Sequence, residues 1–62
     1  YPAGTKVLTN EGETAVVLAQ NKNFQDRPII RIIKDRNGNV VTKEVIKDLV
    51  KVHNIFIEKT LD

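Results

Sequence analysis

The strongest constraint on the fold is a run of β-branched residues from Arg27 to Lys34, in which Ile fills four positions. β-Branched side chains favour extended strands, and successive side chains of a strand point to opposite faces of the sheet. Ile30 and Ile32 therefore share one face, and Arg31 lies on the other. The run predicts a central strand over 27–34, and the Asn37-Gly38 pair after it predicts a hairpin turn from which the chain returns antiparallel.

Four more segments predict strands, because each is short, largely apolar and bounded by turn residues. Asn10-Glu11-Gly12 indicates a tight connection, and 21–26 indicates a polar loop. The predicted strands cover 6–9, 13–20, 27–34, about 41–48 and 55–61. Turns spaced about ten residues apart predict an all-β domain, a small five-stranded partly open barrel or meander that is Src-homology-3-like.

The segment 40–52 admits two interpretations. Four apolar residues recur at helical spacing, namely Val41, Val45, Leu49 and Val52. Against a helix, the segment is rich in β-branched residues, lacks an N-cap pair and follows a hairpin turn that requires a strand. We favour a strand to about residue 48 and then a turn or single helical turn through 49–54, and the strand register near 40–49 stays open.

The predicted core follows from these strands. In the strand 13–20 both faces are apolar, and the larger side chains of Val16 and Leu18 favour the face that they share as the inner one. The expected core is Val7, Val16, Leu18, Ile30, Ile32, Val45, Leu49, Ile55 and Ile57. Ile29, Ile33 and Phe56 remain on faces that this core does not use, and we predict that they form an apolar docking face.

With 62 residues, the chain forms at most one domain, and domains of this size are marginally stable. It has no Cys and a single His, His53, so neither a disulfide framework nor a structural zinc site is available to stabilise it. No segment approaches the roughly 20 apolar residues that span a bilayer. We therefore expect a piece of a longer cytoplasmic protein, which also fits a first residue, Tyr1, that is not Met.

The residues that usually carry chemistry are few and scattered. His53 is the one candidate base, and the carboxylates have the pattern of solvated surface charges. Gly4, Gly12 and Gly38 are too far apart for a phosphate-binding loop. We predict no catalytic, cofactor-binding or metal-binding residue in this chain.

An alternative function is a small-barrel binding module for nucleic acid or a nucleotide. Lys and Arg gather between residues 22 and 36, and the planar guanidinium groups of Arg27 and Arg31 would contact phosphates. The net charge is only +2, and the chain has no Trp and few aromatic residues on which bases could stack. We therefore place this alternative second.

A set of turn and strand residues runs along nearly the whole chain: Tyr1-Pro2-Ala3-Gly4-Thr5-Lys6-Val7, Gly12-Glu13-Thr14-Ala15-Val16-Val17, Asn21, Arg27-Pro28, Asp35, Gly38 and Asp48-Leu49. This set resembles the C-terminal β domain of bacterial HD-GYP proteins. Those proteins are metal-dependent phosphohydrolases of the HD superfamily, many of which hydrolyse cyclic di-GMP.

The resemblance implies an all-β, non-catalytic accessory domain that docks on or positions the catalytic domain of its own parent chain. It also implies that the parent is a metal-dependent phosphohydrolase, such as a cyclic di-GMP phosphodiesterase. That family holds its metal with a His-Asp pair, further histidines and a Gly-Tyr-Pro signature, and none of these motifs occurs here. No catalytic or metal-binding residue is therefore carried over, and no cofactor is expected in this part of the parent.

Overall fold

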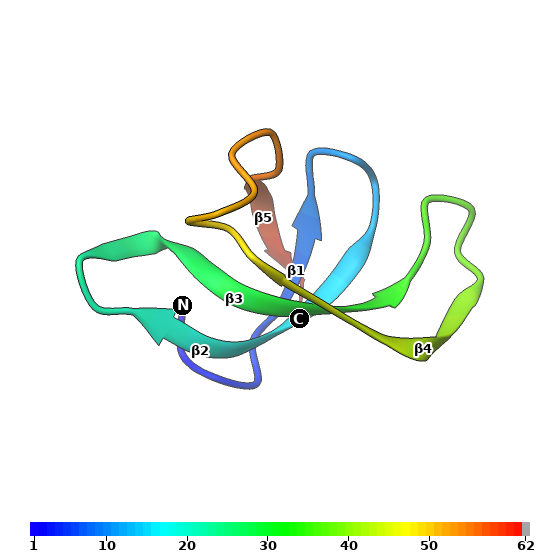
Figure 1. The fold of residues 1–62 in the computed structure, drawn as a ribbon. Helices are drawn as coiled ribbons and strands as arrows, with labels where there is room; N and C mark the ends of the chain where they lie inside the picture. The colour runs from blue at the N-terminus through cyan, green and yellow to red at the C-terminus, as the bar shows by residue number, and fades with distance from the viewer. Residues whose placement is uncertain (62) are drawn as a thin grey trace.

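The structure is a computed structural model that describes residues 1–61. Its strands are β1 (Lys6–Thr9), β2 (Thr14–Asn21), β3 (Phe24–Lys34), β4 (Val40–Asp48) and β5 (Ile57–Leu61). They form one curved antiparallel sheet in the order β4-β3-β2-β1-β5, with no helix among the described residues (Figure 1). Within the described residues β4 and β5 do not pair with each other, so the barrel is partly open. The predicted all-β, five-stranded fold is confirmed.

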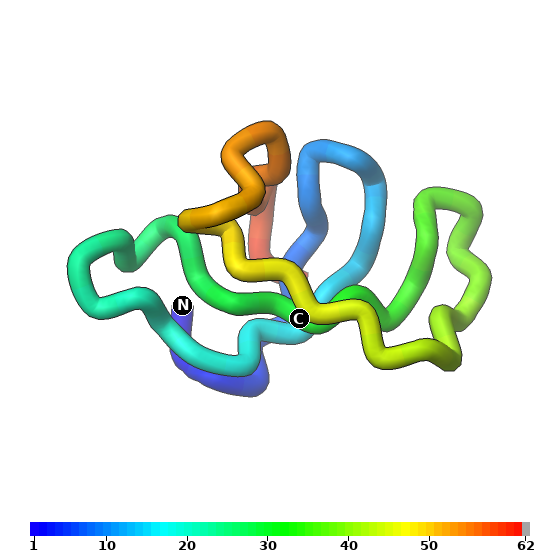
Figure 2. Tube along the Cα trace, in the orientation of Figure 1, coloured from blue at the N-terminus to red at the C-terminus, as the bar shows by residue number. Residues whose placement is uncertain are grey.

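The first and last strands are neighbours in the sheet, where β5 lies beside β1 (Figure 1). Their register places Val7 opposite Thr60. The segment 49–56, yellow to orange in Figure 2, connects the β4 edge to the β5 edge. It lies beside the β1–β2 turn, where Nδ2 of Asn10 donates a hydrogen bond of 3.1 Å to the carbonyl oxygen of Asn54. This crossing segment covers the inner side of the sheet.

The hairpin turn between β3 and β4 forms where the sequence predicts it. Gly38 has a φ of +82°, a conformation that glycine adopts without steric cost. Its backbone N–H donates to the carbonyl oxygen of Asp35, and Oδ1 of Asp35 accepts from the backbone N–H groups of Asn37 and Asn39. β4 then returns antiparallel to β3, so the strand interpretation of the segment up to residue 48 is confirmed and the helical one is wrong.

The expected polar loop over 21–26 is wrong. β2 continues to Asn21 and β3 begins at Phe24, so only a tight turn separates the strands, and Asn21 pairs with Phe24. The residues at this end are exposed, and a two-stranded extension that carries no core has no need of apolar side chains. The polar composition of residues 21–26 therefore indicated a loop, although backbone pairing extends β2 and β3 into this segment.

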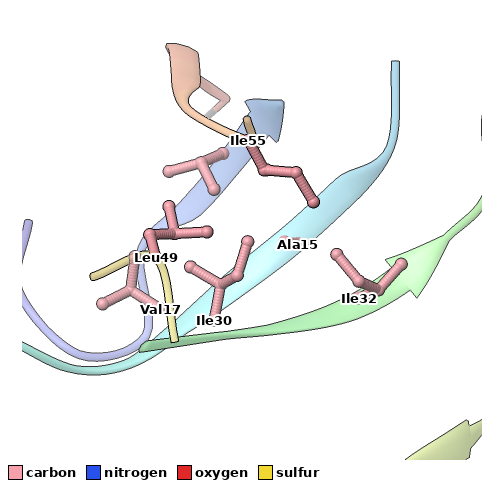
Figure 3. Packing of buried hydrophobic residues seen from close by; sticks show 7 residues of the cluster. Ala15, Val17, Ile30, Ile32, Leu49 and Ile55 are labelled. Atoms are coloured by element: carbon pink, nitrogen blue, oxygen red, sulfur yellow. The ribbon is translucent and has the colours of Figure 1, made fainter. Parts of the chain in front are cut away.

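The core lies between the sheet and the crossing segment 49–56 (Figure 3). Its buried side chains are Val7, Ala15, Val17, Ile30, Ile32, Leu49 and Ile55. Five of the predicted core residues are therefore confirmed as buried: Val7, Ile30, Ile32, Leu49 and Ile55. Val45 and Ile57 are only partly buried, but both pack against this cluster.

The prediction that Val16 and Leu18 belong to the core is wrong. In the β2–β3 register, Ala15 is opposite Ile32 and Val17 is opposite Ile30, so Ala15 and Val17 share the inner face with the buried isoleucines. The crossing segment supplies large side chains to that face, so a residue as small as Ala15 is accommodated there without leaving a void. The size of the side chains in β2 therefore did not indicate which face of the strand packs on the core.

Candidate functional site: the outer face of the sheet

The two faces of the sheet differ in what lies over them. Along β3 the side chains of Pro28, Ile30 and Ile32 are buried on the inner face, and the intervening residues are more exposed. We define the outer face as the side chains of β2, β3 and β4 that point away from the core: Val16, Leu18, Ile29, Arg31, Ile33 and Ile46. Among residues 1–61, no strand or connecting segment packs over this face in the way that 49–56 covers the inner one.

The centre of the outer face is a cross-strand row of three residues. Arg31 on β3 is opposite Val16 on β2 and opposite Ile46 on β4. Directly opposed side chains in a sheet have Cβ atoms about 4.5–5.5 Å apart, so both apolar side chains lie beside the Arg31 stem. Ile46 is 49% exposed, which is high for a large apolar side chain in the middle of a strand.

A bulge in β2 widens the apolar surface. The β2–β3 register shifts between Val17 and Ala19, so Leu18 is the extra residue of the bulge, and Ala19 is opposite Ile29. Leu18 is 41% exposed. The outer face therefore continues from Ile46 through Val16 to the neighbourhood of Ile29 as one surface of mainly apolar side chains.

The structure brings together two of the three residues that we predicted as a docking face. Ile29 and Ile33 are both half-buried on the outer face, two positions to either side of Arg31. Phe56 lies elsewhere, on the crossing segment at the β1–β2 turn, where its backbone N–H donates to Oδ1 of Asn10 at 2.8 Å. The sequence had placed Val16 and Leu18 in the core and had not singled out Ile46, although alternation from Val45 would have indicated its face.

Arg31 has no acidic partner among residues 1–61. The ion pair found among the described residues joins Nζ of Lys47 to Oε1 of Glu13, at 3.7 Å, and does not involve Arg31. The neighbouring strand β4 has two carboxylates, Glu44 and Asp48, and neither forms an ion pair with Arg31. Oδ1 of Asp48 already accepts from Nδ2 of Asn21 at 2.9 Å and from the backbone N–H of Val50 at 3.1 Å. The guanidinium charge of Arg31 is therefore available to another molecule.

Arg27, the other arginine of the alternative phosphate site, is engaged inside the domain. Its Nε donates to the carbonyl oxygen of Leu49, and its Nη2 donates to the carbonyl oxygens of Val52 and Ile55 at 3.0 Å and 2.8 Å, with a longer contact to His53. These bonds hold the crossing segment on β3. A phosphate group at Arg27 would have to compete with them, and no feature of the sequence indicated this set of acceptors.

Other kinds of site are absent from the part of the chain that the structure describes. Residues 1–61 contain no group of three or more His, Cys, Asp or Glu side chains that could hold a metal ion, and they enclose no pocket. His53, the candidate base, is exposed. Within the same residues there is no helix that could cross a membrane.

Comparison with known proteins adds one match. The family model described as "KOW domain associated with HD domain" matches residues 6–62, which is nearly the whole chain. No curated protein and no solved structure matches this chain.

Proposed function

The chain belongs to the family of KOW domains associated with HD domains, and from this premise we propose that it docks on the HD domain of its own parent chain. Its role would be to position or stabilise that domain, with no chemistry of its own. The observation that carries the proposal is the outer face, where three adjacent strands present apolar side chains that no described element covers. Contiguous apolar surface of this kind marks interaction sites in soluble proteins.

Docking through the outer face would stabilise both partners. Leu18 and Ile46 are each about half exposed, so covering them would contribute on the order of 1 kcal/mol apiece, taking full burial of such side chains as about 1.5–3 kcal/mol. A domain of this size is marginally stable by itself, so the same contact would also stabilise its fold. Ile29 and Ile33 contribute in this proposal as members of the same face, and Phe56 would require a second, separate contact.

We further propose that the parent is a bacterial metal-dependent phosphohydrolase of the HD-GYP kind, with cyclic di-GMP as its substrate. The support is the family match together with the turn and strand residues that resemble the C-terminal domain of those proteins. In this proposal the metal and the reacting groups belong to the HD domain, whose signature motifs this chain lacks.

The test is a pair of substitutions in the full-length parent, Ile46→Ser on the outer face and Val40→Ser as a control. Val40 lies in the same strand and is 71% exposed, but it is paired with Lys34, away from the row that contains Arg31. We expect Ile46→Ser to lower the thermal stability of the parent and to change its turnover, and Val40→Ser to change neither. Unchanged stability and turnover in both variants would exclude docking through this face.

A further inference from the structure

Of the six side chains that define the outer face, the charged one is Arg31, which lies at the centre of the apolar members. Arg31 is exposed and lies between Val16 and Ile46 across the sheet and between Ile29 and Ile33 along β3. A partner that covers the apolar side chains of the outer face therefore covers the guanidinium of Arg31 as well.

The domain itself does not neutralise that charge. No carboxylate of residues 1–61 lies within ion-pair distance of Arg31, and this includes Glu44 and Asp48, which lie two positions to either side of Ile46 on β4. The next residue along the same cross-strand row, beyond Val16, is Lys6, which adds a second cation. Withdrawing an unpaired guanidinium from water is unfavourable enough to cancel the gain from the surrounding apolar contacts. The partner must supply the missing anion.

We infer that the HD domain presents an Asp or Glu carboxylate, set within an apolar patch of its own, that pairs with Arg31 when the outer face is covered. This inference rests on the proposed function and specifies the chemistry of the partner surface. A carboxylate is the anionic group that a protein surface offers, and its two oxygens match the planar guanidinium in a bidentate pair. Buried arginines of this kind commonly dominate the energetics of an interface.

The first test replaces Arg31 in the full-length parent and measures how strongly the outer face is protected from hydroxyl-radical oxidation. Leu18 and Ile46 are the reporters, and Phe24, which is 51% exposed in the β2–β3 hairpin, is the internal reference. Arg31→Met keeps the length and apolar area of the side chain and removes its charge. We expect it to lower the docking equilibrium constant at least about tenfold, because the partner's carboxylate is then buried without a counter-charge.

Two further variants fix the sign of the partner's charge. Arg31→Lys is expected to retain most of the protection, because it keeps the positive charge, and Arg31→Glu is expected to abolish it through repulsion. If Arg31→Met leaves the protection unchanged or increases it, the face is met by an apolar surface alone and the inference is wrong.

The same measurement separates this inference from the proposed function. Ile46→Lys provides the undocked state, with Leu18 as the reporter. If the wild type and Ile46→Lys show equal oxidation of Leu18, the outer face is not covered and both the proposed function and the inference fail. If the wild type is protected but Arg31→Met docks equally well, only the inference fails. Protection that appears only after RNA is added would assign the face to nucleic acid and overturn both.

The second test identifies the carboxylate directly. A carbodiimide joins a carboxylate to an amine with no spacer, so in Arg31→Lys it should link position 31 to an Asp or Glu of the HD domain, which mass spectrometry of the digested protein would locate. Gln25→Lys places an amine at an exposed position in the hairpin extension of β3 and serves as the control. A cross-link to Glu44 or Asp48 of the same domain, or none above the Gln25→Lys control, would contradict the inference.

Discussion

Nη2 of Arg27 donates a hydrogen bond of 2.8 Å to the carbonyl oxygen of Ile55, a residue 28 positions later in the chain. Together with the bonds to Leu49 and Val52, it holds the crossing segment over the core. Leu49 and Ile55 are both buried and both belong to that segment, so the guanidinium positions two of the core side chains. The packing of the core against the inner face of the sheet therefore depends on the hydrogen bonds that Arg27 donates to the crossing segment.

Replacing Arg27 should consequently destabilise the whole domain. Arg27→Met removes the donors and leaves part-buried carbonyl oxygens of segment 49–56 without partners, which we expect to cost about 2–4 kcal/mol. Urea unfolding of the 62-residue chain, followed by far-ultraviolet circular dichroism, measures the loss. Arg31→Met on the outer face is the matched control and should shift the midpoint little. Equal shifts for the two arginines would contradict the structural role given to Arg27.

Two adjacent valines test which face of β2 packs on the core. Val17 is buried against Ile30, whereas Val16 lies on the outer face. We expect Val17→Ala to cost about 1–2 kcal/mol more than Val16→Ala, because only the inner site loses packing and leaves a cavity. The measurement is the difference in free energy of unfolding between the two variants, and a larger loss for Val16→Ala would reverse the assignment of the faces.

Any substitution of Gly38 in the β3–β4 turn should lower the stability of the fold through backbone conformation alone. A Cβ atom added there would meet nothing within 4 Å, but the residue has a φ of +82°. Gly38→Ala should therefore destabilise the chain by about 1–2 kcal/mol, and Gly38→Asn by less, since Asn tolerates the left-handed region better. Thermal unfolding of both variants checks the order, and an Ala variant as stable as the wild type would show that the turn does not need this conformation.

If the outer face docks on the HD domain, a substitution on it should destabilise the full-length parent more than the 62-residue chain by itself. In the 62-residue chain by itself, Ile46→Ser should change the free energy of unfolding by less than about 1 kcal/mol, because the side chain is already half exposed. In the full-length parent the same substitution should cost more, because it removes contacts that exist only after docking. Equal losses in the two proteins would mean that Ile46 makes no contact outside this domain.

Much of the architecture was predictable because it is encoded locally. The β-branched run containing Ile30 and Ile32 predicted the central strand and two buried residues, and Asn37-Gly38 predicted the hairpin. The resemblance to an HD-associated β domain is confirmed by the family match, whereas its assignment to HD-GYP proteins stays a proposal. The candidate site was predicted only in part. Ile29 and Ile33 do share a face, but Phe56 lies far along the chain on the crossing segment, and its role in docking stays a prediction.

The sequence by itself determined the number of strands and the turn between β3 and β4, because backbone preference and side-chain alternation act over a few residues. Only the tertiary structure decided which face of β2 is inner, since that choice depends on the register with β3 and on the side chains that Leu49 and Ile55 add from the crossing segment. The same holds for the two arginines. Arg27 finds acceptors more than 20 positions away and becomes structural, whereas Arg31 lies on the uncovered face and has no acidic partner among residues 1–61. Contacts between residues this distant in the chain arise from packing, which local patterns do not specify.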